Sequence, residues 1–110
     1  MNYNIIASEH FKREAKNLIK KYPSLKKDLA LFEKNIEKEL LLAVDLGDGF
    51  KKIRINISSK GKGKSGGGRI ITHETIINVC NKNSVLGSIY DKSKFDTIDI
   101  AILKKILGIE

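Results

Sequence analysis

Apolar residues recur every three or four positions over about the first 40 residues, the spacing of helices that bury one face. The short, partly β-branched stretch Asn2–Ala7 comes before this pattern and predicts a strand. Ser8 can cap the helix that follows, and Pro23 ends it because proline disfavours helical geometry in the preceding residue. The apolar stripes of the two predicted helices are Phe11, Ala15, Leu18, Ile19 and Tyr22, and then Leu25, Leu29, Phe32, Ile36 and Leu40. We therefore expect two antiparallel helices joined by a short turn.

The period changes to two after a predicted turn at Asp45–Gly49, where two glycines flank an aspartate. Three isoleucines then alternate with polar residues, which predicts a strand with one buried face and one cationic outer row. The buried row is Ile53, Ile55 and Ile57, and the outer row is Lys52, Arg54 and Asn56.

Four further elements are predicted beyond this strand. They are a flexible loop over Ser58–Gly68, a strand over Arg69–Val79, a hairpin turn at Asn81-Lys82-Asn83 and a last strand over Val85–Lys92. The side chains expected on one face of the last strand are Leu86, Ser88, Tyr90 and Lys92. Asp96 or Thr97 is expected to open a final helix whose apolar residues are Ile98, Ile102, Leu103, Ile106 and Leu107.

The order strand, two helices, three strands and helix predicts an α+β fold. Its parts are an N-terminal strand, a helical hairpin, an antiparallel sheet packed on helices by one face, and a C-terminal helix. The 110 residues fit a single domain, residues 1–110, with one core.

The charge of the chain is concentrated in one glycine-rich window from Phe50 to Arg69. The chain holds 21 Lys and Arg against 13 Asp and Glu, and the window holds seven of the cations and no acid. These seven are Lys51, Lys52, Arg54, Lys60, Lys62, Lys64 and Arg69. Such a surface attracts a polyanion, and nucleic acid is the first candidate.

Other classes of function find little support in the composition. The longest apolar run, Leu40–Val44, is far shorter than the ~20 residues of a membrane span, and no signal peptide is apparent. Cys80 is a lone cysteine without a marked base nearby, so we interpret it as a small structural residue. With two histidines as the only other classical ligands, the expectation is a cytoplasmic protein without metal, cofactor or membrane partner.

The run Gly61-Lys62-Gly63-Lys64-Ser65 invites comparison with a phosphate-binding P-loop. That motif needs a glycine where this chain has Ser58, and a helix afterwards where a strand is predicted. A nucleotide-binding P-loop is therefore not expected. A solvated basic hairpin loop is the plain alternative.

The strands beside this loop add polar side chains to one predicted sheet face. They are Lys52 and Arg54 on the first strand, Arg69 and His73 on the second, and Tyr90 and Lys92 on the third. Arginine binds phosphate bidentately, and tyrosine can stack on a base. The hypothesis is a nucleic-acid interface; the alternative is a strand with an ordinary polar face.

A catalytic role is also conceivable for this face. Clustered cations can stabilise the charge that develops on a phosphate when the neighbouring 2′-hydroxyl attacks it. A crowded lysine could act as acid or base. His73 and Glu74 are expected on opposite faces of a regular strand, so His73 is either a structural residue or a contributor to binding. The residues support binding more directly than any specific reaction.

Three segments together resemble the RelE/ParE superfamily of bacterial toxins, and above all its HigB-like branch. They are Phe50-Lys51-Lys52-Ile53-Arg54, then Ser59-Lys60-Gly61-Lys62-Gly63-Lys64-Ser65-Gly66-Gly67-Gly68-Arg69-Ile70-Ile71, then Ile89-Tyr90-Asp91-Lys92. The segment from Lys20 to Asp28, with its Tyr-Pro-Ser-Leu core, also fits that branch. The resemblance spans most of the chain.

The resemblance implies a RelE-like fold, with a helical hairpin against a twisted antiparallel sheet. It also implies a toxin of a type II toxin–antitoxin system, a ribosome-dependent mRNA endoribonuclease neutralised by a cognate antitoxin. The residues that it assigns to catalysis are Lys52, Arg54, Arg69 and Lys92, with Tyr90 in place of a tyrosine that RelE carries on its last helix. The further residues expected to contact RNA are Lys51, Lys60, Lys62, Lys64 and His73.

Two other functions stay open at this stage. One is a ParE-like inhibitor of DNA gyrase without nuclease chemistry, which the resemblance also implies. The other is a non-catalytic nucleic-acid-binding domain. The spread of cations over both strands and the loop favours the nuclease over the gyrase inhibitor.

Overall fold

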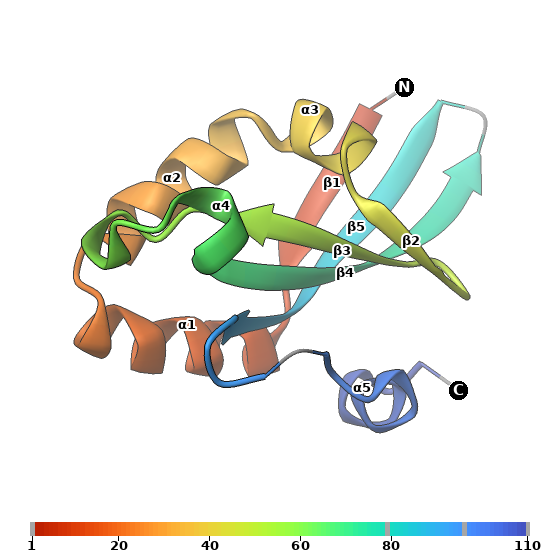
Figure 1. Cartoon of the computed structure of the whole chain (residues 1–110). Helices are drawn as coiled ribbons and strands as arrows, with labels where there is room; N and C mark the ends of the chain where they lie inside the picture. Colours follow the sequence, from red (N-terminus) through yellow and green to blue (C-terminus); the bar gives the residue numbers. More distant parts are fainter. Residues whose placement is uncertain (1, 79, 96, 110) are drawn as a thin grey trace.

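The computed structural model describes residues 2–78, 80–95 and 97–109 (Figure 1). Its strands are β1 (Asn2–Ala7), β2 (Val44–Gly47), β3 (Phe50–Ile55), β4 (Gly68–Asn78) and β5 (Asn81–Asp91). Its helices are α1 (Glu9–Lys21), α2 (Leu25–Lys34), α3 (Ile36–Leu41), α4 (Gly63–Gly66) and α5 (Ile100–Leu107), with a 3₁₀ turn, η1 (Ser58–Lys60), before α4. The fold is α+β, as the order of predicted elements indicated.

The five strands form one open sheet in the order β1-β5-β4-β3-β2. The neighbours from β2 to β5 are antiparallel, but β1 pairs with β5 in parallel, so the sheet is mixed and the expected antiparallel sheet is only part of it. Because β4 occupies one edge of β5, the backbone groups of β1 find their partners along the other edge.

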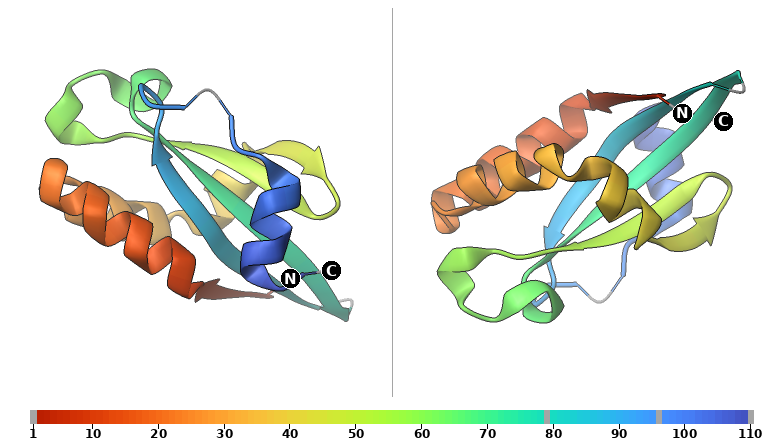
Figure 2. Two further views of the ribbon diagram at one scale, coloured as in Figure 1. Left: turned by 90° about the horizontal axis from the view of Figure 1, so that it is seen from below. Right: turned by 90° about the horizontal axis from the view of Figure 1, so that it is seen from above.

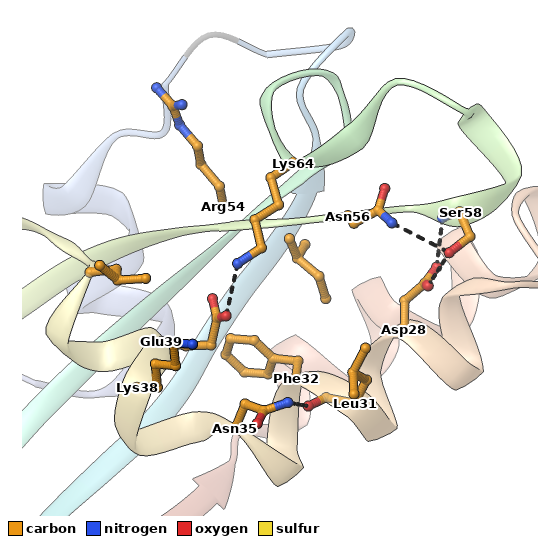
Figure 3. A pocket seen from close by; sticks show the side chains of 12 residues that line it. Asp28, Leu31, Phe32, Asn35, Lys38, Glu39, Arg54, Asn56, Ser58 and Lys64 are labelled. Atoms are coloured by element: carbon orange, nitrogen blue, oxygen red, sulfur yellow. Dashed lines mark hydrogen bonds and ion pairs between the residues drawn. The ribbon is translucent and has the colours of Figure 1, made fainter.

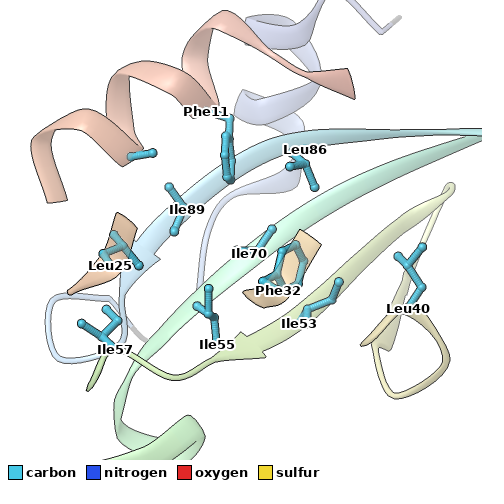
Figure 4. Packing of buried hydrophobic residues seen from close by; sticks show 11 residues of the cluster. Phe11, Leu25, Phe32, Leu40, Ile53, Ile55, Ile57, Ile70, Leu86 and Ile89 are labelled. Atoms are coloured by element: carbon cyan, nitrogen blue, oxygen red, sulfur yellow. The ribbon is translucent and has the colours of Figure 1, made fainter. Parts of the chain in front are cut away.

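Two apolar clusters lie on opposite faces of this sheet. The alternating residues Ile53, Ile55 and Ile57 are buried, as predicted, in the larger cluster (Figure 4). Helices α1 to α3 supply the other side of that cluster, including Phe11, Leu25, Phe32 and Leu40. Helix α5 lies over the second face (Figure 2). There Leu103 packs with Phe50, Ile71 and Tyr90. The sheet therefore has helices on both faces.

The first helix begins and ends as the sequence predicts. Ser8 Oγ accepts a hydrogen bond from the backbone N–H of Phe11 at 3.0 Å, and α1 stops before Tyr22. The second predicted helix is interrupted at Asn35, which separates α2 from α3. The Asn35 side chain donates to the carbonyl of Leu31 at 3.0 Å, and such local bonding competes with helix continuation.

Strand pairing extends into two of the predicted turns, so one prediction is partly wrong and the other is wrong. Asp45 lies in β2, opposite Lys51 of β3. Asn81-Lys82-Asn83 is the start of β5, where each residue pairs with β1 on one side and with β4 on the other, opposite Asn78, Ile76 and Thr75. Hydrogen bonding to two strands outweighs the local turn preference of asparagine. Val79, the predicted end of a strand, lies outside the described residues.

The expected common face of Leu86, Ser88 and Tyr90 is also wrong. The β4–β5 register shifts between Ile71, opposite Ser88, and Thr72, opposite Leu86, so Gly87 is an extra residue in β5. A bulge of this kind reverses which residues face one side of the sheet. Leu86 consequently joins the larger cluster, and Tyr90 joins the second.

The last helix begins later than expected. Helix α5 starts at Ile100, and the Asp99 side chain accepts from the backbone N–H of Ile102 at 3.2 Å. Thr97 precedes the helix, and Asp96 lies outside the described residues. Gly108 ends the helix at a positive φ of 71°.

Candidate nucleic-acid interface

The sheet register brings three of the predicted catalytic residues together. Arg54 of β3 lies opposite Arg69 of β4, and Arg69 lies opposite Tyr90 of β5. Directly opposed residues share a sheet face, so the three side chains form one row across three strands. Lys52 lies in the next row, opposite Ile71. We call the exposed or half-buried cations here, Lys52 and Arg54 of β3 and Lys62 and Lys64 at α4, the cationic surface.

Arg69 is buried beneath this surface. Its side chain is 4% exposed, and its guanidinium donates to the carbonyl oxygens of Lys64, Ser65 and Gly68 at 3.0, 3.0 and 2.9 Å. Burial lowers the pKa of Arg69, and the neighbouring charge of Arg54 lowers it further. The guanidinium thus fastens α4 to the sheet while adding a positive charge beneath Arg54.

Arg54 and Lys52 are the strand cations that solvent reaches. Arg54 is exposed, and Lys52 is half-buried. An exposed guanidinium can bind a phosphate with two parallel hydrogen bonds, and a second cation nearby adds attraction. The buried charge of Arg69 behind them makes this row favourable for an anion.

Tyr90 and Lys92 lie differently from the sequence-based expectation. Tyr90 is 4% exposed within the second cluster, and its ring makes an edge contact with Phe95 at 6.1 Å between centroids. Lys92 lies in the turn after β5, where its backbone N–H donates to the Gly67 carbonyl at 3.1 Å. The phenol therefore lies beneath the surface, and Lys92 is not part of the strand row.

Lys60, expected to contact RNA, points inward. Its side chain is 6% exposed, and its ammonium pairs with Asp91 Oδ1 at 2.6 Å. Tyr22 donates its hydroxyl to Asp91 Oδ2 at 2.7 Å, and Ser93 donates its hydroxyl to Oδ1 at 2.8 Å. Burial opposes ionisation of Asp91, but the hydrogen bonds from Lys60, Tyr22 and Ser93 outweigh it and lower the pKa of the carboxyl well below its usual range.

The stretch Ser58–Gly68, expected to be a flexible loop, contains η1 and α4 and is tied to the rest of the chain. Ser58 N donates to Asp28 Oδ2 at 2.9 Å, and Ser59 N donates to Ser24 Oγ at 2.8 Å. At Gly67 a Cβ atom would lie 2.2 Å from the carbonyl oxygen of Ile55. A glycine is therefore required there for the close approach to β3.

Lys51 lies on the other face of the sheet from the cationic surface, whereas His73 lies on the same face, in the row beyond Lys52. Lys51 alternates with Lys52 and pairs with Glu74 at 3.0 Å, and Glu74 also lies 3.5 Å from Lys82. His73 lies opposite Phe50 with 4.7 Å between ring centroids. The register thus confirms the expected common face for Lys52, Arg54 and Arg69 and extends it to His73, but it removes Lys51 from that face.

Beside the cationic surface lies a groove of about 470 Å³ between α2–α3 and β3–α4 (Figure 3). Arg54 and Lys64 line it as well, and Lys64 reaches across to Glu39 at 2.8 Å. Its other lining residues are Asp28, Leu31, Phe32, Asn35, Lys38, Leu42, Ile55, Asn56 and Ser58. The groove is continuous with the cationic surface through these two shared cations.

Sequence reasoning missed this groove and the Asp91 network. Tyr22 belonged to an apolar stripe and to the Lys20–Asp28 segment of the resemblance, and neither indicated a contact with Asp91, which is 31 residues from Lys60. The side chains of the groove come from α2, α3, β3 and α4, so no local spacing joins them. Tyr22, Lys60 and Asp91 all lie in segments noted for their resemblance, but no spacing in the sequence joined the three residues.

Comparison with known proteins gave no matching family model and no match among curated protein sequences. In the described part of the chain, no group of three or more His, Cys, Asp or Glu side chains could hold a metal ion. No helix among the described residues is both long and apolar enough to cross a membrane.

Proposed function

We propose that this chain binds single-stranded RNA on its cationic surface and cleaves it as a RelE-type ribonuclease toxin. The observation that carries the proposal is the pairing of Arg54 with Arg69 across β3 and β4. Like charges at directly opposed positions destabilise a sheet. A sheet that keeps two arginines there, one of them buried, is suited to a polyanion that offsets the repulsion.

The proposed chemistry follows from what these side chains can do. The 2′-hydroxyl of one nucleotide loses its proton and attacks the adjacent phosphorus. The bond to the 5′-oxygen of the next nucleotide breaks, and that oxygen takes up a proton, which leaves a 2′,3′-cyclic phosphate and a 5′-hydroxyl. Arg54 and Lys52 stabilise the extra negative charge on the phosphate oxygens, and Arg69 strengthens the local positive potential. No metal or cofactor is invoked in this scheme.

The fold is compatible with this proposal. Helices α1 and α2 pack against one face of the sheet, while the cationic row lies on the face that α5 partly covers. In the RelE-like arrangement that the resemblance implies, the ribosome presents the mRNA and a cognate antitoxin blocks access. Both partners belong to the proposal.

A second candidate is favoured by the burial of Tyr90. A phenol that is 4% exposed and packed against Phe95 cannot reach a phosphate while α5 stays in place. The remaining cations suffice for binding without catalysis. A non-catalytic nucleic-acid-binding domain is therefore the alternative.

The test is tightly induced expression of the chain followed by primer extension on cellular mRNAs. New 5′ ends inside translated codons are expected, and they should disappear when translation initiation is blocked. Arg54→Ala should abolish them, whereas Arg13→Ala, at an exposed position of α1, should not. Growth arrest with intact mRNA would instead direct attention to gyrase, and RNA binding without new ends would support the binding domain.

A further inference from the structure

The groove beside the cationic surface combines apolar walls with amide side chains. Leu31 and Leu42 are 62% and 67% exposed, although both line it. Asn35 and Asn56 lie along the same groove (Figure 3). We propose that the groove is a nucleobase subsite for a single-stranded RNA whose phosphates lie on the cationic surface. This inference rests on the proposed function and names a part of its substrate recognition.

The charges of the groove favour an anionic strand at its mouth. Both acids along it are already engaged: Asp28 accepts hydrogen bonds from Ser58 and Ser24, and Glu39 pairs with Lys64. Arg54 is exposed at the boundary between the groove and the cationic surface. A phosphate bound there leaves its nucleoside within reach of the groove.

The size and chemistry of the groove suit a base. A volume of about 470 Å³ is within the range of small-molecule sites. Asn35 donates one N–H to the Leu31 carbonyl, and Asn56 donates one to Ser58 Oγ. Each amide therefore keeps a second N–H and its oxygen, which can pair with the Watson–Crick edge of an unstacked base. The leucine side chains supply apolar contact for the ring faces, as expected where bases leave solvent.

The backbone edge of β3 adds further hydrogen-bonding groups. Strand β2 pairs only with Phe50, Lys51 and Lys52, so the outer edge of β3 beyond Lys52 borders the groove. An extended acidic peptide could also use such an edge. The asparagine pair and the continuity with the phosphate-binding cations favour the nucleotide.

The first experiment is a titration of ¹⁵N-labelled protein, with the side-chain amide signals of Asn35 and Asn56 as the readout. The probes are the four 5′-mononucleotides, the corresponding nucleosides, inorganic phosphate and an acidic peptide. At least one mononucleotide should shift both amide signals at a concentration where phosphate perturbs only the surroundings of Arg54 and Lys64. The inference is overturned if phosphate alone reproduces the full pattern, if no nucleotide shifts the amides, or if only the peptide does.

The second experiment compares two substitutions that change the charge equally. Leu42→Glu lies in the groove, whereas Leu41→Glu is at the neighbouring position, 81% exposed and outside the groove. Leu42→Glu removes the apolar contact with one base. The affinity for a seven-nucleotide RNA should therefore be about tenfold lower in Leu42→Glu than in Leu41→Glu. Thermal unfolding should stay close to that of the unmodified chain in both, because both side chains are largely exposed.

These measurements distinguish failure of the subsite proposal from failure of the proposed function. If RNA affinity falls with Arg54→Ala but is equal for the two leucine variants, the cationic surface stands and the subsite is overturned. If nucleotides shift the amide signals although mRNA stays intact in cells, the subsite is supported and the ribonuclease proposal fails.

Discussion

At the scale of single residues, the side chains around Asp91 decide how the basic segment is held. Lys60 and Asp91 form a buried ion pair, and Tyr22 adds a hydrogen bond from the end of α1. The Lys60 ammonium also lies 3.3 Å from the carbonyl of Gly67. Three separate segments therefore meet at one carboxylate.

Replacing Lys60 by methionine should strongly destabilise the fold. The substitution leaves a buried carboxylate without its cation, which costs about 3 kcal/mol or more in the free energy of unfolding. Lys62→Met, at an exposed position two residues on, should change it by less than about 0.5 kcal/mol. Urea denaturation of both variants measures the difference, and equal stabilities would contradict the role given to the pair.

The lowered pKa of Asp91 predicts a loss of stability in acid. In the unfolded chain an aspartate takes up a proton near pH 4, whereas the folded carboxylate resists protonation until lower pH. Its stabilising contribution is thus complete above about pH 4 and is lost as the pH falls further. The free energy of unfolding, measured by urea denaturation at pH 7, 5 and 3, should fall less in Asp91→Asn than in the unmodified chain. Equal decreases in the two proteins would contradict the stabilising role of the Asp91 carboxylate.

At the scale of elements, α4 depends on Arg69. A helix of four residues cannot hold itself together by its own hydrogen bonds, and the Arg69 guanidinium satisfies carbonyls of Lys64 and Ser65. The absence of a side chain at Gly67 lets the segment pass close to Ile55. The cations of α4 are therefore presented by contacts from β3 and β4.

Arg69→Ala should affect stability as well as function. Removing the guanidinium leaves carbonyl groups without their donors, and we expect a loss of about 3 kcal/mol in the free energy of unfolding. Arg54→Ala, at an exposed position, should reduce RNA binding with little effect on thermal unfolding. Calorimetry on the two variants separates these roles, and a stable Arg69→Ala protein would show that α4 is held by other contacts.

At the scale of the whole molecule, the cations are distributed unevenly over the surface. The chain carries a net charge of +8, and the cationic surface comprises Lys52, Arg54, Lys62 and Lys64, of which Arg54 and Lys64 line the groove. Lys51 is paired with Glu74, Lys60 with Asp91 and Lys64 with Glu39, and only the Lys64 pair lies at the groove. The number of cations available to a polyanion is thus smaller than the seven in the sequence window.

The salt dependence of RNA affinity reports how many of these cations contact phosphates. If all four contact phosphates of a single strand, which requires Lys64 to exchange Glu39 for a phosphate, the slope of log affinity against log salt concentration is about −3. Arg54→Ala should make the slope shallower by about 0.7, while Arg13→Ala should leave it unchanged. Fluorescence anisotropy with a labelled RNA between about 50 and 200 mM salt measures it, and a slope near zero would exclude the proposed interface.

The sequence by itself determined the features that depend on near neighbours. The Ser8 cap, the end of α1 before Pro23 and the alternation of Ile53, Ile55 and Ile57 follow from local spacing and side-chain chemistry. The cationic window was equally visible, because charge is a property of composition.

Only the tertiary structure decided which of those residues act together. The register of β3 and β4 placed Arg54 against Arg69, and the bulge at Gly87 sent Leu86 and Tyr90 to opposite faces. Burial turned Lys60 toward Asp91. Pairing register and burial arise from contacts between residues distant in the sequence, which local periodicity does not encode.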